Sequence, residues 1–357
     1  MPRTARNLYP TLCSFENLYL GWRKARRGKR GQPEVATFEM RVERNLFQLQ
    51  EELQSGRYRP GRYHSFYIHE PKQRLISAAP FRDRVVHHAL CNIIEPVFER
   101  TFIHDSYANR VGKGTHAALD RCTEFMRRHR YVLACDVRQY FPSIDHTILR
   151  AILAHKIADR RVMWLVDTIL AGGSGVLDTE YTMTWFPGDD LLAATRPRGL
   201  PIGNLTSQFW ANVYLNELDQ FIKRELHCRA YLRYVDDFLL FHDDLGQVHA
   251  WREAVIERLA SLRLKLHEGR AQPRPVTEGV SFLGFMVFPT HRRLRRHKVI
   301  YARRHLKRLL FEYAAGTLSL DQLHMHVQGW VNHARYGDTW GLRRAVLSAH
   351  ALPPVAG

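Results

Sequence analysis

YLRYVDDFLLF, residues 231–241, is the stretch that decides the fold, because Asp236 and Asp237 interrupt a run of apolar and aromatic side chains. Two strand-like segments joined by a short polar step predict a tight β-hairpin with the acids at its turn. A buried carboxylate without a partner is costly, so such a pair normally coordinates a metal or joins an ion pair. The pattern therefore predicts a hairpin whose turn residues bind a metal or form an ion pair.

A second strand-like run, YVLACDV at residues 131–137, ends on Asp136. One acid at a strand end and two at a hairpin tip can converge on two divalent ions, as two-metal phosphoryl transfer requires. We therefore expect Asp136, Asp236 and Asp237 to be catalytic, and we expect these three residues with Val137 to hold two Mg²⁺ ions.

The charge balance indicates a polyanionic partner. The chain has 357 residues, enough for two or three structural units, and its 45% hydrophobic and 25% charged residues are ordinary for a soluble protein. Lys and Arg number 53 against 35 Asp and Glu, a net charge of +18. A GC-rich genome would explain the preference for Arg over Lys, but it does not explain the net charge. Abundant Arg and aromatic residues favour nucleic acid over a membrane surface.

The cysteines and the hydropathy pattern bear on location. Five scattered cysteines without a CxxC pair favour a reducing compartment and argue against a zinc site. The sequence contains neither a signal segment nor an apolar stretch of about 18 residues. We expect a cytoplasmic protein that does not contact membranes.

A dense basic cluster lies near the N-terminus, and residues 34–54 follow it with the apolar spacing of one amphipathic helix. A solvated helix end would explain the cluster, but the net charge favours contact with nucleic acid. The predicted contacts are Arg23, Lys24, Arg26, Arg27, Lys29 and Arg30.

The remaining pattern mixes strands and helices. Residues 58–76 read as strands, 279–289 as a turn followed by one strand, and 198–208 as a Gly/Pro loop that presents backbone N–H groups. His87 and His88 read as ordinary packing or surface residues, and Asp145 and Asp219 as capping and surface acids. Helices are predicted for residues 83–99, 112–130 after a Gly-rich turn, 146–170, 206–225, 245–262 and much of 291–352.

Six motifs follow one another along the chain: RLI (74–76) with FRDRVVHHAL (81–90), SYANRVGKGTHAAL (106–119), CDVRQYFPSID (135–145), YVDD (234–237), LRLKLHEGR (262–270) and GVSFLGF (279–285). This order of parts resembles the reverse transcriptases of bacterial retroelements over residues 58–300. The resemblance implies an α+β right-hand polymerase fold. It would have a basic N-terminal helical extension (1–57), fingers (58–130), a palm with an antiparallel sheet (131–290, with a helical insertion at about 146–200) and a helical thumb (291–357).

The resemblance also assigns roles around the acids. Arg74 and Arg84 would contact the triphosphate of the incoming dNTP, and Phe141, five residues after Asp136, would exclude a 2′-hydroxyl. Gly203 and Gln208 would lie near the templating base pair. Arg270 stands where the family has a lysine, which keeps the charge but puts a general-acid role in doubt because Arg does not readily release a proton.

One departure from the family pattern points to a subtype. Most reverse transcriptases have a QG…SP pattern where this chain has IGNLTSQ at residues 202–208. That form resembles the enzymes of diversity-generating retroelements, which copy a template RNA into cDNA with errors at adenines and work with a small basic helical accessory protein. The alternatives are a group II-like or phage-defence reverse transcriptase, and an RNA-binding scaffold that keeps the fold without activity.

Overall fold

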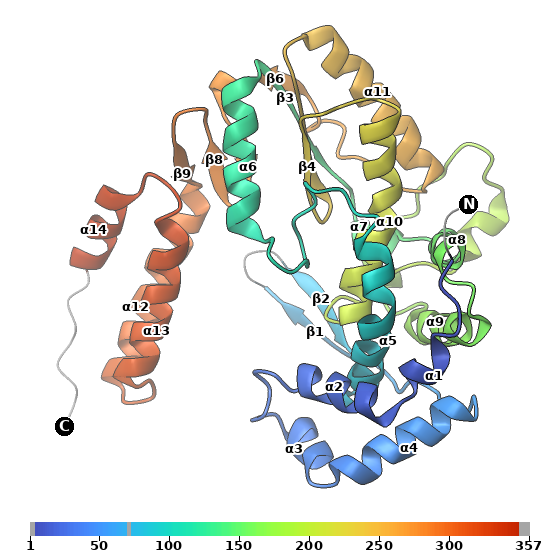
Figure 1. Ribbon diagram of the computed structural model, residues 1–357. Helices are drawn as coiled ribbons and strands as arrows, with labels where there is room; N and C mark the ends of the chain where they lie inside the picture. Colours follow the sequence, from blue (N-terminus) through green and yellow to red (C-terminus); the bar gives the residue numbers. More distant parts are fainter. Residues whose placement is uncertain (1–3, 70–72, 350–357) are drawn as a thin grey trace.

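The computed structural model describes residues 4–69 and 73–349, which form an α+β protein. The N-terminal helices lie beside the long helix α5 (Phe81–Glu99), and α2 makes the most extensive contact with it (Figure 1). The prediction of one helix over residues 34–54 is wrong, because Arg41 has a non-helical backbone (φ −136°, ψ 43°) and divides it. The N-terminal elements are α1 (Tyr9–Leu12), α2 (Phe15–Ala25), α3 (Pro33–Glu39) and α4 (Val42–Gln54).

A two-stranded antiparallel sheet follows the N-terminal helices. It pairs β1 (His64–Ile68) with β2 (Arg74–Ala78), so the predicted strands of residues 58–76 are confirmed. The amide of Ser77 donates to the carbonyl of Ile202 at 2.8 Å, which ties β2 to the Gly/Pro loop. The Gly-rich turn and helix predicted at residues 112–130 are also present, with α6 at Thr115–Arg128.

The central sheet contains the predicted hairpin. Its strands are antiparallel to their neighbours in the order β4-β5-β3-β6, with β3 at Tyr131–Asp136, β4 at Tyr231–Tyr234, β5 at Asp237–His242 and β6 at Pro273–Pro275. Phe238 and Leu240 of β5 belong to the large hydrophobic core, and Leu239 and Phe241 to a smaller core on the opposite face. The sheet is therefore buried on both faces. Its acids lie at one end of the two inner strands, β3 and β5.

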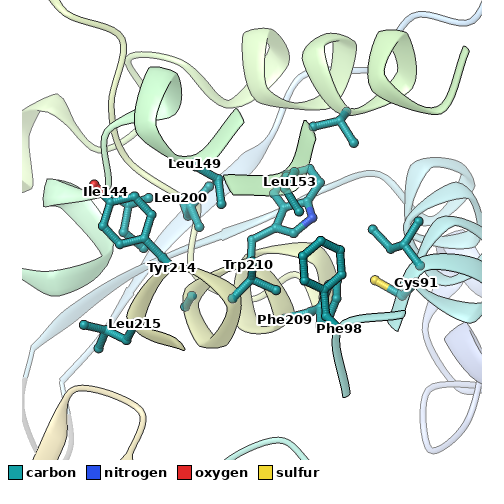
Figure 2. Close-up of a cluster of buried hydrophobic side chains, with 14 of the residues drawn as sticks. Cys91, Phe98, Ile144, Leu149, Leu153, Leu200, Phe209, Trp210, Tyr214 and Leu215 are labelled. Atoms are coloured by element: carbon teal, nitrogen blue, oxygen red, sulfur yellow. The ribbon is translucent and has the colours of Figure 1, made fainter. Parts of the chain in front are cut away.

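Helices cover the face of the sheet that packs on the large core. Figure 2 shows side chains of α5, α8 and α10 packed together there, among them Phe98, Leu153 and Trp210. This packing joins α5 to the central sheet through α10. The helices are α7 (Tyr140–Ser143), α8 (His146–Lys156), α9 (Arg160–Gly173), α10 (Leu205–Arg224) and α11 (Leu245–Ser261), with short 3₁₀ turns at Asp178–Glu180, Leu191–Thr195 and Val276–Glu278.

The C-terminal part begins with a small sheet. A single strand was predicted for residues 279–289, but Leu283 (φ 48°) and Gly284 (φ 89°) turn the chain, and the segment forms two strands. These are β7 (Val280–Phe282) and β8 (Phe285–Val287), which pair with β9 (Arg292–Leu294).

Three helices end the described chain and lie to one side, beyond β9 (Figure 1). They are α12 (Arg296–Ala314), α13 (Leu320–Ala334) and α14 (Trp340–Ser348), as the basic helical C-terminus predicted. Across the described ranges, none of the helices combines the length and apolarity that crossing a bilayer requires.

Candidate active site

The strand register brings the predicted acids to one place. Asp136, the last residue of β3, is paired with Asp237, the first residue of β5. Asp236 lies in the hairpin turn, and its carbonyl accepts a hydrogen bond from the amide of Val137 at 3.4 Å. Adjacent antiparallel strands thus present three acids from segments that are distant in the sequence.

Burial and a neighbouring charge act on Asp236. Burial is the larger cause and the Asp136 carboxylate the second, and together they raise the pKa of Asp236 to about 6, against the weaker opposing effect of Arg74 and Arg233. A divalent cation between two such carboxylates would favour their charged forms. The electrostatics of the pair therefore fit a metal-binding role.

Two basic residues approach Asp136 from the segment after α11. Its Oδ2 atom lies 3.9 Å from Nε2 of His267 and 3.8 Å from Nη1 of Arg270, and the His267 amide donates to the Asp136 carbonyl at 2.9 Å. His267 was missed in the sequence, although it lies in the LRLKLHEGR motif three residues before Arg270.

The side chains alone do not form a complete metal cage. Within residues 4–69 and 73–349, three or more His, Cys, Asp or Glu side chains nowhere gather closely enough to hold an ion. Mg²⁺ is commonly bound by one or two carboxylates together with substrate phosphates and water. Asp136 and Asp236 fit that mode, with the phosphates as the missing ligands.

The predicted nucleotide contacts divide into two groups. Arg74 is the first residue of β2. Its positive charge is near enough to Asp236 to lower the pKa of that carboxyl. Arg84 is 13% exposed; its Nε donates to the Ala79 carbonyl at 2.7 Å and its Nη2 lies 3.7 Å from Oε1 of Glu34. Arg74 therefore lies near the acids, whereas Arg84 is bound to Ala79 and Glu34.

Phe141 lies close to Asp136 along the chain, on the short helix α7. The helix starts after Gln139, which adopts a left-handed backbone (φ 46°). The half-buried Phe141 ring packs edge-on against Tyr140, with centroids 5.6 Å apart. The backbone amide of Leu200 donates to the Phe141 carbonyl at 2.9 Å, and this bond ties α7 to the Gly/Pro loop.

The Gly/Pro loop is held closely against β2. Gly203 has φ 115°, and a Cβ there would lie 3.0 Å from Cγ2 of Ile76, so the position suits glycine. The Asn204 side chain fixes the loop by donating to the carbonyls of Ser77 and Pro201 and accepting from the Ala79 amide. Gln208 is exposed in the first turn of α10.

The acids and the hairpin lie within a region that matches a known protein family. The sequence profile described as reverse transcriptase (RNA-dependent DNA polymerase) matches residues 68–287, which include both arms of the hairpin and the β3 acid. The chain belongs to the reverse transcriptase family. It is accordingly an RNA-directed DNA polymerase with a palm and fingers fold, as the sequence predicted.

The relatives of this reverse transcriptase include proteins encoded in introns. It is 30% identical to protein YkfC of Escherichia coli over 281 residues, 66% of the chain and 69% of YkfC. It is 24% identical to the group II intron-encoded protein LtrA of Lactococcus lactis over 235 residues, 64% of the chain but only 37% of LtrA. Nuclear intron maturase 1 of Arabidopsis thaliana is 29% identical over 90 residues, 25% of the chain and 13% of the maturase.

The reverse transcriptase also contains a buried ion pair that sequence reasoning misjudged. Asp219 was expected at the surface, but it is completely buried, and its carboxylate binds the equally buried Arg233. Asp145 does cap a helix, as expected, by accepting from the amides of Thr147 and Ile148. An arginine inside the apolar run YLRY was the available signal for a buried acidic partner.

The basic cluster of the reverse transcriptase is only partly free to meet a polyanion. Arg26 donates to Glu39 at 2.7 Å and lies 4.0 Å over the Trp22 ring. Lys24 donates to the side chain of Asn92, and burial is the main cause that lowers the pKa of Lys29. The exposed members are Arg23, Lys24, Arg27 and Arg30, although Lys24 is bonded to Asn92 and Nε of Arg30 lies 3.7 Å from Glu39.

Proposed function

We propose that this reverse transcriptase copies a template RNA into cDNA by two-metal-ion nucleotidyl transfer at Asp136 and Asp236. The observation that carries the proposal is the pairing of Asp136 with Asp237 at adjacent strand ends, next to the turn residue Asp236, whose pKa is raised by burial and by Asp136. Mg²⁺, when bound, would supply charge stabilisation for the attacking and leaving oxygens. The two carboxylates would hold it, and Asp237 and the Val137 backbone would complete the site.

The other residues of the site have separate roles in this proposal. Arg74 binds the triphosphate, since its charge already reaches Asp236. Arg84 is a second predicted phosphate contact that would first have to leave its Ala79 and Glu34 partners. Phe141 excludes the ribose 2′-hydroxyl. Gly203 and Gln208 lie along the templating pair.

Primer extension on an RNA template tests the metal assignment. Asp136→Asn and Asp236→Asn each keep the side-chain shape and remove the charge, so extension should fall by a factor on the order of a thousand or more, while RNA binding stays unchanged. Asp243→Asn is the matched control, because Asp243 lies just beyond the other end of β5 and is 58% exposed. Substantial extension by either site variant in Mg²⁺ would remove the two-metal assignment.

The basic cluster is proposed to contact the template RNA. Three exposed arginines are available for this role, and each phosphate contact contributes to the salt dependence of binding. We therefore expect a flatter plot of log affinity against log salt when Gln replaces Arg23, Arg27 and Arg30. A control triple variant changes the exposed Arg160, Arg224 and Arg229. Equal slopes for the cluster variant and the wild type would assign the cluster to the solvated surface.

The subtype proposed is the mutagenic enzyme of a diversity-generating retroelement, working with a small basic helical accessory protein. Its support is the IGNLTSQ loop, which the structure holds against β2 and at the entry of α10. Its test is the neighbourhood of the gene, where a template and variable repeat pair and an accessory gene are expected.

A group II-like or phage-defence reverse transcriptase is the second candidate. The relatives favour it, because LtrA is a group II intron-encoded protein and the plant relative is an intron maturase. A surrounding group II intron, or a gene neighbourhood without a repeat pair, would select this candidate.

A cytoplasmic location belongs to the same proposal. All five cysteines are buried and unbridged, which suits a reducing compartment. The enzyme should therefore function with every cysteine reduced. We expect equal activity with and without a thiol reductant.

A further inference from the structure

Arg233 is a fully buried arginine in the middle of β4, beside the turn that carries Asp236. A guanidinium has five N–H donors, and each of them has an acceptor here. Nε donates to Oδ1 of Asp219 at 2.8 Å and Nη2 to Oδ2 at 2.6 Å, a bidentate pair. The remaining acceptors are Oδ1 and the carbonyl of Asn212, at 3.1 and 3.5 Å, and the carbonyl of Val235, at 2.9 Å.

The partner carboxylate is fixed as firmly as the arginine. Asp219 projects from α10 and also accepts a hydrogen bond from the Tyr231 hydroxyl at 2.6 Å. Burial opposes the charge of Arg233, but the attraction of Asp219 outweighs it, so the pKa of Arg233 is raised. The charge of Arg233 therefore persists in the interior, where an ion pair without supporting hydrogen bonds would be unfavourable.

The turn held by this pair has an unusual backbone. Val235 adopts φ 57°, in the left-handed region that β-branched residues rarely occupy. Such a conformation persists only where its surroundings enforce it. On one side the Arg233 guanidinium binds the Val235 carbonyl, and on the other the Val137 amide donates to the carbonyl of Asp236.

We propose that Arg233, oriented by Asp219, is a positioning residue that holds the hairpin turn so that Asp236 stays opposite Asp136. The inference rests on the proposed role of these two acids as metal ligands. Two neighbouring carboxylates repel each other when no cation lies between them. The bond from Arg233 to the Val235 carbonyl opposes that repulsion from inside the core.

The same network reaches the segment that precedes α6. The Arg233 amide donates to the Asp105 carbonyl at 2.9 Å, and the Tyr107 amide donates to the Arg233 carbonyl at 2.9 Å. Asn212 donates from its side chain to the carbonyl of Ala108 at 2.8 Å. Arg233 therefore joins α10, the hairpin turn and residues 105–108, so a change at this side chain is felt at the turn.

Arg233→Lys tests the role, because lysine keeps the charge but cannot bind Asp219 bidentately and the Val235 carbonyl at once. In primer extension we expect kcat to fall by about tenfold or more, with a several-fold higher Mg²⁺ requirement, since metal binding must now order the turn. The KM for dNTP should change less, because Arg74 and Phe141 are untouched.

Arg110→Lys is the matched control. Arg110 is 8% exposed, pairs with Glu99 and donates to the carbonyls of Ile103 and Ser106, and these partners lie outside the hairpin turn. We expect a comparable loss in melting temperature with an unchanged Mg²⁺ requirement. A Mg²⁺ requirement that shifts equally in both variants would overturn the positioning role.

A rescue experiment separates positioning from general stability. Glycine adopts φ 57° without strain, so adding Val235→Gly to Arg233→Lys should recover several-fold in kcat while leaving the lost bidentate contact with Asp219 unrepaired. No recovery, or a kcat of the folded Arg233→Lys protein equal to wild type, would overturn the proposal. If Arg233→Lys does not fold, Asp219→Asn with and without Val235→Gly provides the same comparison. An active Asp236→Asn enzyme would instead refute the metal site on which the inference rests.

Discussion

The hairpin of the central sheet and helix α12 use charge in opposite ways. In the hairpin, Arg233 and Asp219 are both 0% exposed and bound at hydrogen-bond distances, so a shift of one atom matters. On α12, basic side chains such as Arg303, Arg304 and Lys307 are exposed, and only three residues of the helix are buried. The difference teaches that the hairpin fixes the position of each charge, whereas α12 leaves its charges in solvent, and we expect the number of charges on α12, not their exact placement, to matter.

Among the changes that test this comparison, the largest effect is expected on α12, which we expect to bind a polyanion. Replacing Arg303, Arg304 and Lys307 with Gln should lower affinity for an RNA–DNA primer-template by about tenfold to a hundredfold near 0.1 M salt, and flatten the salt slope. Fluorescence anisotropy over a salt series measures both quantities. The triple variant of Arg160, Arg224 and Arg229 is the control, and Asp236→Asn should leave the slope unchanged. An α12 variant with wild-type affinity would break the comparison.

The second prediction concerns the stability cost of the buried acid. The pKa of Asp236 is raised to about 6, so the folded state retains a proton that the unfolded chain releases near pH 4. Stability should fall as the pH rises from about 4 to 6, and Asp236→Asn should be more stable than wild type at pH 8, by on the order of 2 kcal/mol without metal.

Thermal unfolding in EDTA at pH 4 and pH 8 measures this effect. The advantage of Asp236→Asn should vanish at pH 4, where the wild-type carboxyl is neutral, and the exposed Asp243→Asn should show no such pattern. An advantage of equal size at both pH values would mean that packing, not charge, separates the two proteins.

The third prediction tests the floor of the nucleotide site. Phe141→Ala removes a ring five residues after Asp136 and should raise the efficiency of rNTP incorporation relative to dNTP by about tenfold, since a steric clash supplies the discrimination. Single-nucleotide insertion with both substrates measures the ratio. Tyr140→Phe is the control, because it removes only a hydroxyl that bonds the Ala211 carbonyl. Unchanged discrimination would place the gate at another residue.

The smallest expected effect concerns fidelity. Restoring the common family pattern with Ile202→Gln and Gln208→Pro should lower misincorporation by a few-fold, chiefly opposite template adenine. The Gln208 amide donates to the Asn204 carbonyl at 3.2 Å, and proline would remove that bond, so the helix entry must tolerate its loss. Sequencing cDNA from an RNA of balanced composition, with Ile202→Gln alone as a control, measures the spectrum. Uniformly low errors in the wild-type product, with any accessory partner supplied, would refute the mutagenic subtype.

Local patterns predicted much of the fold and the heart of the site. The hairpin at residues 231–241, the strand ending at Asp136 and the long helices follow from periodicity over short windows. The pair of Asp219 and Arg233 could not be read in this way, because fourteen residues and a change from helix to strand separate them. The break at Arg41 and the turn at Leu283 were missed because neighbouring apolar residues continued the pattern on both sides.

Helix α2 lies so close to α5 that the two surfaces form one seam. A Cβ at Gly21 would stand 2.8 Å from the Val85 carbonyl and 3.2 Å from the Ala89 amide. Asn17 spans the same seam by donating to the Ala89 carbonyl at 3.0 Å. A chain shortened to begin at residue 58 would expose this face of α5 to water. We therefore expect functional recombinants to inherit α2 and α5 from the same parent enzyme.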